Sequence, residues 1–75
     1  MQGSKLEQEQ AYFLTFCIEQ FKHKKNADGL TIKNLFDKTG VSSYLVENFD
    51  VLHTQGKDWI LDDIDSYIKN RIEQK

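Results

Sequence analysis

Hydrophobic residues recur along most of the chain every three or four positions, which is the spacing of one face of an α-helix. The first such segment predicts a helix from about Lys5 to Lys24. Its apolar residues cover more than one face, a distribution typical of a helix that neighbours contact from several sides. The polar stretch from Asn26 to Gly29 then predicts a turn.

The middle of the chain predicts two shorter helices. Thr31 is expected to cap the second helix and Gly40 to end it, with apolar positions at Ile32, Leu35 and Phe36. Ser42 or Ser43 is expected to cap the third, which runs to about residue 53 with apolar positions at Tyr44, Leu45, Phe49 and Leu52. Gly56 closes the third helix, and we expect it to adopt positive φ.

A fourth helix is predicted from a single apolar face formed by Ile60, Leu61, Ile64, Tyr67, Ile68 and Ile72. Three aspartates crowd its start and two basic residues lie near its end, which suits the helix dipole. Residues 57–60 either belong to this helix or form a short extended segment before it. The fold class is therefore all-α: a compact bundle of about four short helices. We expect one domain over residues 1–75, with an ordered core of about residues 5–73.

The segment from Leu30 to Phe49 resembles a helix-turn-helix unit, with its turn at residues 39–42. Two features count against DNA binding. Phe36 stands where two crossing helices usually need a small residue. The second helix of the pair offers no lysine or arginine to neutralise phosphate, and its polar residues are Ser43, Glu47, Asn48 and Asp50. An architectural helix pair is the favoured interpretation, and a DNA-binding regulator is the alternative.

Composition narrows the class of protein further. A chain of 75 residues buries only a small core, so we expect its stability to be modest unless a partner contributes. Cys17 is its one cysteine and cannot form an internal disulfide, which argues against a secreted scaffold. The longest apolar block, residues 11–18, is too short to cross a bilayer, and no signal-peptide pattern begins the chain. We expect a cytoplasmic protein without membrane association.

The net charge of −2 conceals an asymmetry along the chain. Residues 22–38 contain five lysines and two aspartates, whereas residues 41–68 contain six acidic residues and one lysine. Solvated helix faces explain such a pattern most simply. The functional interpretation is an acidic face for a basic partner.

Candidate chemistry is sparse. The acidic cluster of Asp58, Asp62, Asp63 and Asp65 lies mostly within one predicted helical turn, so capping explains it better than a metal site. Cys17 and His53 are a formal nucleophile and base, but Cys17 lies in the most apolar stretch and no orienting third residue is evident. We expect no enzyme activity, no cofactor and no metal. Trp59 is expected to pin the last loop to the core; were it exposed, it would be a candidate binding hot spot.

Two segments carry a family resemblance. Residues 52–56, Leu-His-Thr-Gln-Gly, and residues 60–68, Ile-Leu-Asp-Asp-Ile-Asp-Ser-Tyr-Ile, resemble the signature of a family of small bacterial proteins of unknown function. Residues 16–19, 35–36 and 40–41 resemble it as well, and the similarity extends over about residues 12–69. Trp59 departs from the family pattern, where tyrosine or another residue is expected. Five residues match the pattern: His53, Thr54, Gly56, Asp63 and Asp65.

The resemblance implies an antitoxin-like or accessory role, because members of that family are often encoded beside a protein resembling an ADP-ribosyltransferase toxin. A polar clasp between the end of the third helix and the start of the fourth would account for the matching residues without any ligand. The sequence thus predicts a protein-interaction module that binds another protein. It leaves open whether two copies of the chain associate. The candidate interaction or clasp residues are His53, Thr54, Gly56, Trp59, Asp63 and Asp65.

Overall fold

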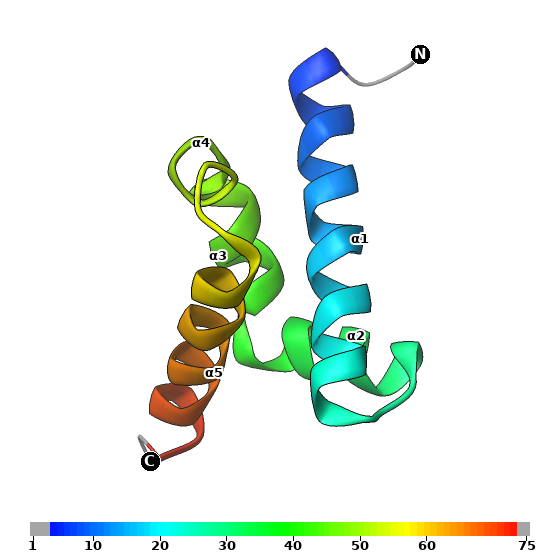
Figure 1. Ribbon diagram of the computed structural model, residues 1–75, viewed down its shortest axis with the longest axis vertical. Coiled ribbons are helices and arrows are strands. Elements are labelled where there is room, and N and C mark those ends of the chain that lie inside the picture. Colours follow the sequence, from blue (N-terminus) through cyan, green and yellow to red (C-terminus); the bar gives the residue numbers. More distant parts are fainter. Residues whose placement is uncertain (1–3, 74–75) are drawn as a thin grey trace.

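A computed structural model describes residues 4–73, which contain helices and no strand (Figure 1). The helices are α1 (Lys5–Lys25), α2 (Gly29–Thr39), α3 (Val41–Glu47), α4 (Phe49–Leu52) and α5 (Lys57–Glu73). The all-α bundle is therefore confirmed, and the segment expected as a third helix consists of α3 and the single turn α4. None of the helices in this part of the chain is both long and apolar enough to cross a membrane.

Helix α1 begins with a capping box. The Ser4 hydroxyl accepts a hydrogen bond from the Glu7 amide, and the Glu7 carboxylate accepts one from the Ser4 amide, each at 3.1 Å. Asn26 ends the helix in the left-handed conformation, with φ of 54°. Contacts with α2, α3 and α5 bury one side of α1, but Tyr12 and Phe16 stay exposed on another side. Several helices therefore contact α1, as the sequence predicts, but these contacts leave Tyr12 and Phe16 exposed.

Helix α2 starts earlier than the sequence predicts. Asp28 is its cap, because the Asp28 carboxylate accepts a hydrogen bond from the Thr31 amide at 2.8 Å. This hydrogen bond lowers the pKa of Asp28. Thr31 is consequently a residue of the first turn, and Gly29 lies inside the helix instead of ending a turn.

The corner between α2 and α3 is a single residue. Gly40 ends α2 as expected, in the left-handed conformation with φ of 87°, and α3 begins at the next residue. Neither Ser42 nor Ser43 caps α3, so that expectation is wrong. The Ser42 hydroxyl instead donates a hydrogen bond to Asp37 at 2.9 Å, and Val41 packs fully buried behind the corner.

The predicted third helix is broken at Asn48. The side-chain amide of Asn48 donates a hydrogen bond to the Tyr44 carbonyl at 2.9 Å, and its backbone leaves the helical region at φ −110° and ψ 23°. The chain then makes one further turn, α4, which brings Phe49 edge-on against Phe13 of α1, with ring centroids 5.5 Å apart. A continuous helix is therefore the wrong prediction for residues 42–53.

Helix α5 begins immediately after Gly56, because the Ile60 amide already donates to the Gly56 carbonyl at 3.0 Å. Residues 57–60 are thus helical and not an extended segment. Gly56 does not adopt positive φ, in contrast to Gly40. Its predicted role as a left-handed helix terminator is wrong.

One hydrophobic core joins the helices. Phe21 of α1 and Phe36 of α2 contact each other with ring centroids 5.5 Å apart, and both are buried. Phe36 is thus a large, fully buried residue at the position where a helix-turn-helix usually has a small one, and it packs against α1. The remaining core residues come from all of the helices: Cys17, Ile32, Val41, Leu45, Leu52, Ile60, Leu61, Ile64 and Ile68.

Candidate interaction surface

The residues expected to form a clasp have separate partners. His53 Nδ1 lies 2.6 Å from the Phe49 carbonyl oxygen, and the imidazole stacks on the Phe49 ring with centroids 4.3 Å apart. The Thr54 hydroxyl donates to the Val51 carbonyl at 2.7 Å. Both side chains therefore terminate α4 locally, and the hydrogen bonds found within residues 4–73 do not join them to Asp63 or Asp65.

Asp63 belongs to a different arrangement, between α3 and α5. The Tyr44 hydroxyl donates a hydrogen bond to the Asp63 carboxylate at 2.6 Å, and this bond raises the pKa of Tyr44 to about 12, with smaller contributions from burial and from the charge of Asp63. The Tyr44 ring stacks on Tyr67, with centroids 4.5 Å apart. Asp63 lies in the second turn of α5, so its predicted role as a first-turn cap is wrong.

The stack continues to the α2–α3 corner. The Arg71 guanidinium lies over the Tyr67 ring, 5.1 Å from its centroid, and Arg71 Nε donates to the Thr39 carbonyl at 3.1 Å. We call Asp63, Tyr44, Tyr67 and Arg71 the tyrosine ladder. It ties α5 to both helices of the central pair. The sequence pattern does not predict this arrangement, because Tyr67 continues the apolar face of α5 and Arg71 near the helix end suits the helix dipole.

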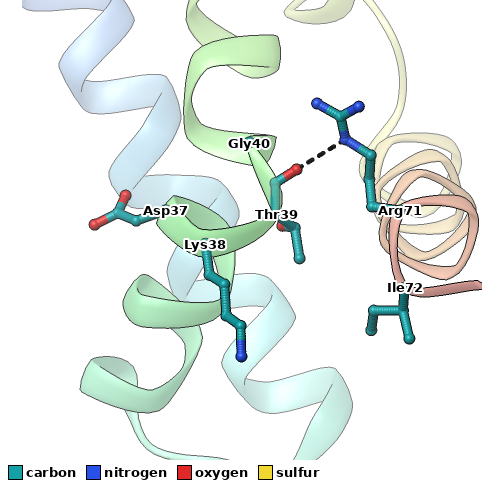
Figure 2. A pocket seen from close by; sticks show the side chains of 6 residues that line it. All are labelled: Asp37, Lys38, Thr39, Gly40, Arg71 and Ile72. Atoms are coloured by element: carbon teal, nitrogen blue, oxygen red, sulfur yellow. Dashed lines mark hydrogen bonds between the residues drawn. The ribbon is translucent and has the colours of Figure 1, made fainter. Parts of the chain in front are cut away.

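Figure 2 shows the shallow pocket beside this ladder, lined by residues 37–40, Arg71 and Ile72. Arg71 reaches towards the corner, whereas the Lys38 side chain extends in the opposite direction (Figure 2). The Asp37 carboxylate is held by Lys33 at 2.9 Å and by the Ser42 hydroxyl. The polar groups therefore do not converge on a common point, and the pocket lacks the arrangement that a small anionic ligand needs.

Ion pairs between α1 and α5 partly neutralise the charge asymmetry along the chain. Lys25 of α1 pairs with Asp65 of α5 at 3.1 Å, and Lys24 lies 3.6 Å from Asp62. Asp65 is thus an ion-pair partner and does not cap α5, which begins at residue 57. Since Asp65 already has a lysine beside it, the acidic surface available to a partner is smaller than the sequence suggests.

Trp59 is half exposed, with 50% of its surface accessible, and it does not pin a loop to the core. It lies in the first turn of α5, on the face directed away from the core residues Ile60 and Ile64. With residues three, four and seven positions further along the helix it lines a shallow depression formed by Trp59, Asp62, Asp63 and Ser66. We call these four residues the Trp59 face.

The groups considered for catalysis are placed poorly for it. Cys17 is completely buried, and this burial raises the pKa of its thiol to about 12, so a thiolate nucleophile does not form near neutral pH. His53 is exposed at the end of α4 and bonds to a backbone carbonyl. Across residues 4–73, no three His, Cys, Asp or Glu side chains gather closely enough to hold a metal ion.

The sequence model of a family described as "Protein of unknown function (DUF3791)" matches residues 12–71. This match covers most of the chain, so the protein belongs to the DUF3791 family. No curated protein and no solved structure shows significant similarity to the chain.

Proposed function

We propose that this member of the DUF3791 family is a protein-interaction module, and that its Trp59 face binds a basic surface of another protein. The observation that carries the proposal is a half-exposed tryptophan surrounded by carboxylates. Tryptophan is enriched among the residues that dominate binding energy, and an exposed one is costly to keep in water.

The chemistry of the face favours a cationic partner. An indole ring attracts a lysine or arginine placed over its face, with a gain of roughly 0.5–2 kcal/mol. The Asp62 carboxylate is 78% exposed despite its contact with Lys24, and Asp58 is exposed on the preceding turn. Together these groups would steer a basic surface towards Trp59 and accelerate its association.

The family resemblance supplies the proposed partner: the product of a neighbouring gene, for which the chain acts as an antitoxin-like or accessory binder. We place this complex in the cytoplasm, where the lone Cys17 thiol remains reduced. The rival role, a DNA-binding regulator, draws no support from α3. The chain from Thr39 to Gly56 contains neither lysine nor arginine, and phosphate contacts require such cations.

The test is binding of the purified neighbouring gene product to the full chain, measured by calorimetry. Replacing Trp59 by alanine should weaken binding about 30-fold, the loss typical of a hot-spot residue. Asp62→Lys should weaken it as well and reduce its dependence on salt, because an attractive charge is lost.

Val51→Ala is the matched control, since Val51 is also an exposed apolar residue on a helix but lies outside the Trp59 face. It should leave the affinity unchanged. Circular dichroism must show the same helix content for every variant. If Trp59→Ala binds the partner as tightly as the wild type, the proposed face is wrong. A sequence-selective gel shift with duplex DNA at physiological salt would support the regulator instead.

A further inference from the structure

Asp63 differs from its neighbours on α5 in how its charge is balanced. Asp62 and Asp65 each lie beside a lysine of α1, but none of the ion pairs found within residues 4–73 includes Asp63. Its side chain is partly buried, and its carboxylate accepts a hydrogen bond from the neutral hydroxyl of Tyr44. A carboxylate without an internal cation attracts a cation from outside more strongly than one that is already paired.

Asp63 also borders the exposed tryptophan. It follows Trp59 by four residues, so the two side chains lie on the same side of α5, and both line the same shallow depression. The indole ring is flat and carries negative charge density above its face. Trp59 and Asp63 therefore offer one cation two kinds of attraction, a π face and a carboxylate one helical turn further along.

Tyr44 fixes the direction of this carboxylate from the neighbouring helix α3. Its hydroxyl donates to Asp63 Oδ2 at 2.6 Å, and stacking on Tyr67 holds its ring in place. The other oxygen, Oδ1, takes part in none of the hydrogen bonds found within residues 4–73. No unpartnered polar side-chain atom of this part of the chain is fully buried, so Oδ1 reaches the solvent. A carboxylate held in one orientation loses less entropy when it binds a partner.

We propose that the Trp59 face binds an arginine of the partner, whose guanidinium stacks on Trp59 and donates to Asp63. Tyr44 lies outside the depression and acts as the positioning residue for Asp63. This inference rests on the proposed function and adds the identity of the anchoring side chain. Arginine suits the site better than lysine because a guanidinium is planar. It lies flat on an indole while its N–H groups point along the plane to a carboxylate, whereas an ammonium is a compact, strongly hydrated charge.

The first test compares two small probes of equal charge, N-acetyl-arginine methylamide and N-acetyl-lysine methylamide. Each is titrated into the full, isotope-labelled chain, and the NMR signal of the indole N–H reports on the site because the chain contains one tryptophan. The arginine probe should bind saturably, with a dissociation constant on the order of 5 mM. The lysine probe should bind roughly threefold more weakly or worse.

Variants then separate the charge of the carboxylate from its orientation. Asp63→Asn should weaken binding of the arginine probe about tenfold, because the amide keeps an acceptor for Tyr44 but has no charge. Asp65→Asn is the matched control, since it removes the same charge from the same helix at a residue outside the depression. It should leave the affinity unchanged at physiological salt.

Tyr44→Phe tests the positioning role. It should weaken binding of the arginine probe about threefold and leave the lysine probe unaffected, since an ammonium needs no oriented carboxylate. In the Asp63→Asn background it should have no further effect. A general loss of structure would instead weaken both probes alike, and that result would contradict the positioning role. Circular dichroism verifies that each variant keeps the helix content of the wild type.

The same variants, titrated with the neighbouring gene product, distinguish this inference from the proposed function. If Trp59→Ala weakens that complex but Asp63→Asn does not, the Trp59 face stands and the arginine contact is wrong. If the gene product does not bind but the arginine probe binds and depends on both residues, the arginine site stands and the assigned partner is wrong. Two probes of equal affinity would overturn the choice of arginine. An indole signal that does not move up to about 50 mM arginine probe, tenfold above the expected constant, would overturn the site itself.

Discussion

Two glycines stand at helix corners of this protein, and they behave differently. Gly40, between α2 and α3, has φ of 87° and is followed by the fully buried Val41. Gly56, before α5, does not have positive φ, and a side chain added there would meet no atom within 4 Å. The same residue type in a similar sequence setting is thus a conformational requirement at one corner and not at the other. The two corners differ in their packing. Val41, directly after Gly40, is buried in the core, whereas residues 53–59 around Gly56 are exposed.

The largest expected effect comes from giving both corners the same side chain. Gly40→Val should lower the free energy of unfolding by about 2 kcal/mol, because a β-branched residue is strained at positive φ. Its Cβ would also approach the Arg71 guanidinium to about 3.1 Å. In a domain of this size the melting temperature should fall by about 8–16 °C. Gly56→Val should change stability by no more than ~0.5 kcal/mol. Equal melting temperatures in a calorimetric scan would contradict the distinction between the corners.

A second prediction concerns the tyrosine ladder that supports the Gly40 corner. Tyr44→Phe and Asp63→Ala should each cost about 1–2 kcal/mol, because each removes a partly buried, charge-assisted hydrogen bond. The double variant should cost much less than the sum, since either change alone already breaks the bond. Urea denaturation of the four proteins gives this coupling energy. At the other corner, Thr54→Val should cost less, because its hydrogen bond to Val51 is exposed. Additive losses from Tyr44 and Asp63 would show that the two side chains act separately.

The ladder should also give the protein a specific sensitivity to alkaline pH. The hydrogen bond to Asp63 raises the pKa of Tyr44 to about 12 in the folded state, above the value of about 10 in an unfolded chain. Between these values the unfolded state binds fewer protons than the folded state, so the free energy of unfolding falls as pH rises. The contribution is complete below pH 10 and is lost as pH approaches about 12. The stability difference between wild type and Tyr44→Phe should therefore shrink between pH 9 and pH 12. A difference that stays constant over that range would exclude this role for the proton.

Local sequence signals predicted the helices well but their boundaries and partners poorly. The spacing of Ile60, Ile64 and Ile68 sufficed for α5, because one apolar face defines a helix without knowledge of its neighbours. The cap at Asp28 also has a local signal, an aspartate three residues before Thr31, but Thr31 is itself a favourable capping residue and gives a competing signal. The break at Asn48 had none that was decisive, because burying Phe49 against Phe13 of α1 is a long-range contact.

The candidate site shows the same division. Trp59 and Asp63 were singled out from the sequence, and both lie on α5, but their surroundings differ from the expectation. Tyr44 and Asp63 are 19 residues apart in the chain. No periodicity within one helix could have paired them, since the pairing depends on how α3 and α5 pack. Exposure of Trp59 likewise depends on the helix starting at residue 57, which turns its side chain away from the core.

The smallest expected effect distinguishes two roles for Asp65. If Asp65 were a first-turn cap, replacing it would lower the free energy of unfolding by about 1 kcal/mol. This loss would persist at high salt, because it arises from a hydrogen bond to a backbone amide. The structure instead pairs Asp65 with Lys25 at the surface, where such pairs contribute roughly 0.2–1 kcal/mol and are screened by ions. Asp65→Asn should thus lower the melting temperature by a few degrees in low salt, and the difference should vanish in about 1 M sodium chloride. The measurement is a pair of thermal scans of each protein, at low and at high salt, with Lys25→Gln as a second variant that should show the same salt dependence.

Calcium or magnesium at low millimolar concentration should leave the wild-type melting temperature unchanged, since a cation that binds the folded state would raise this temperature in a saturable way. A loss that survives high salt would return Asp65 to the role of a cap, and a saturable rise with either cation would make the acidic residues of α5 a metal site.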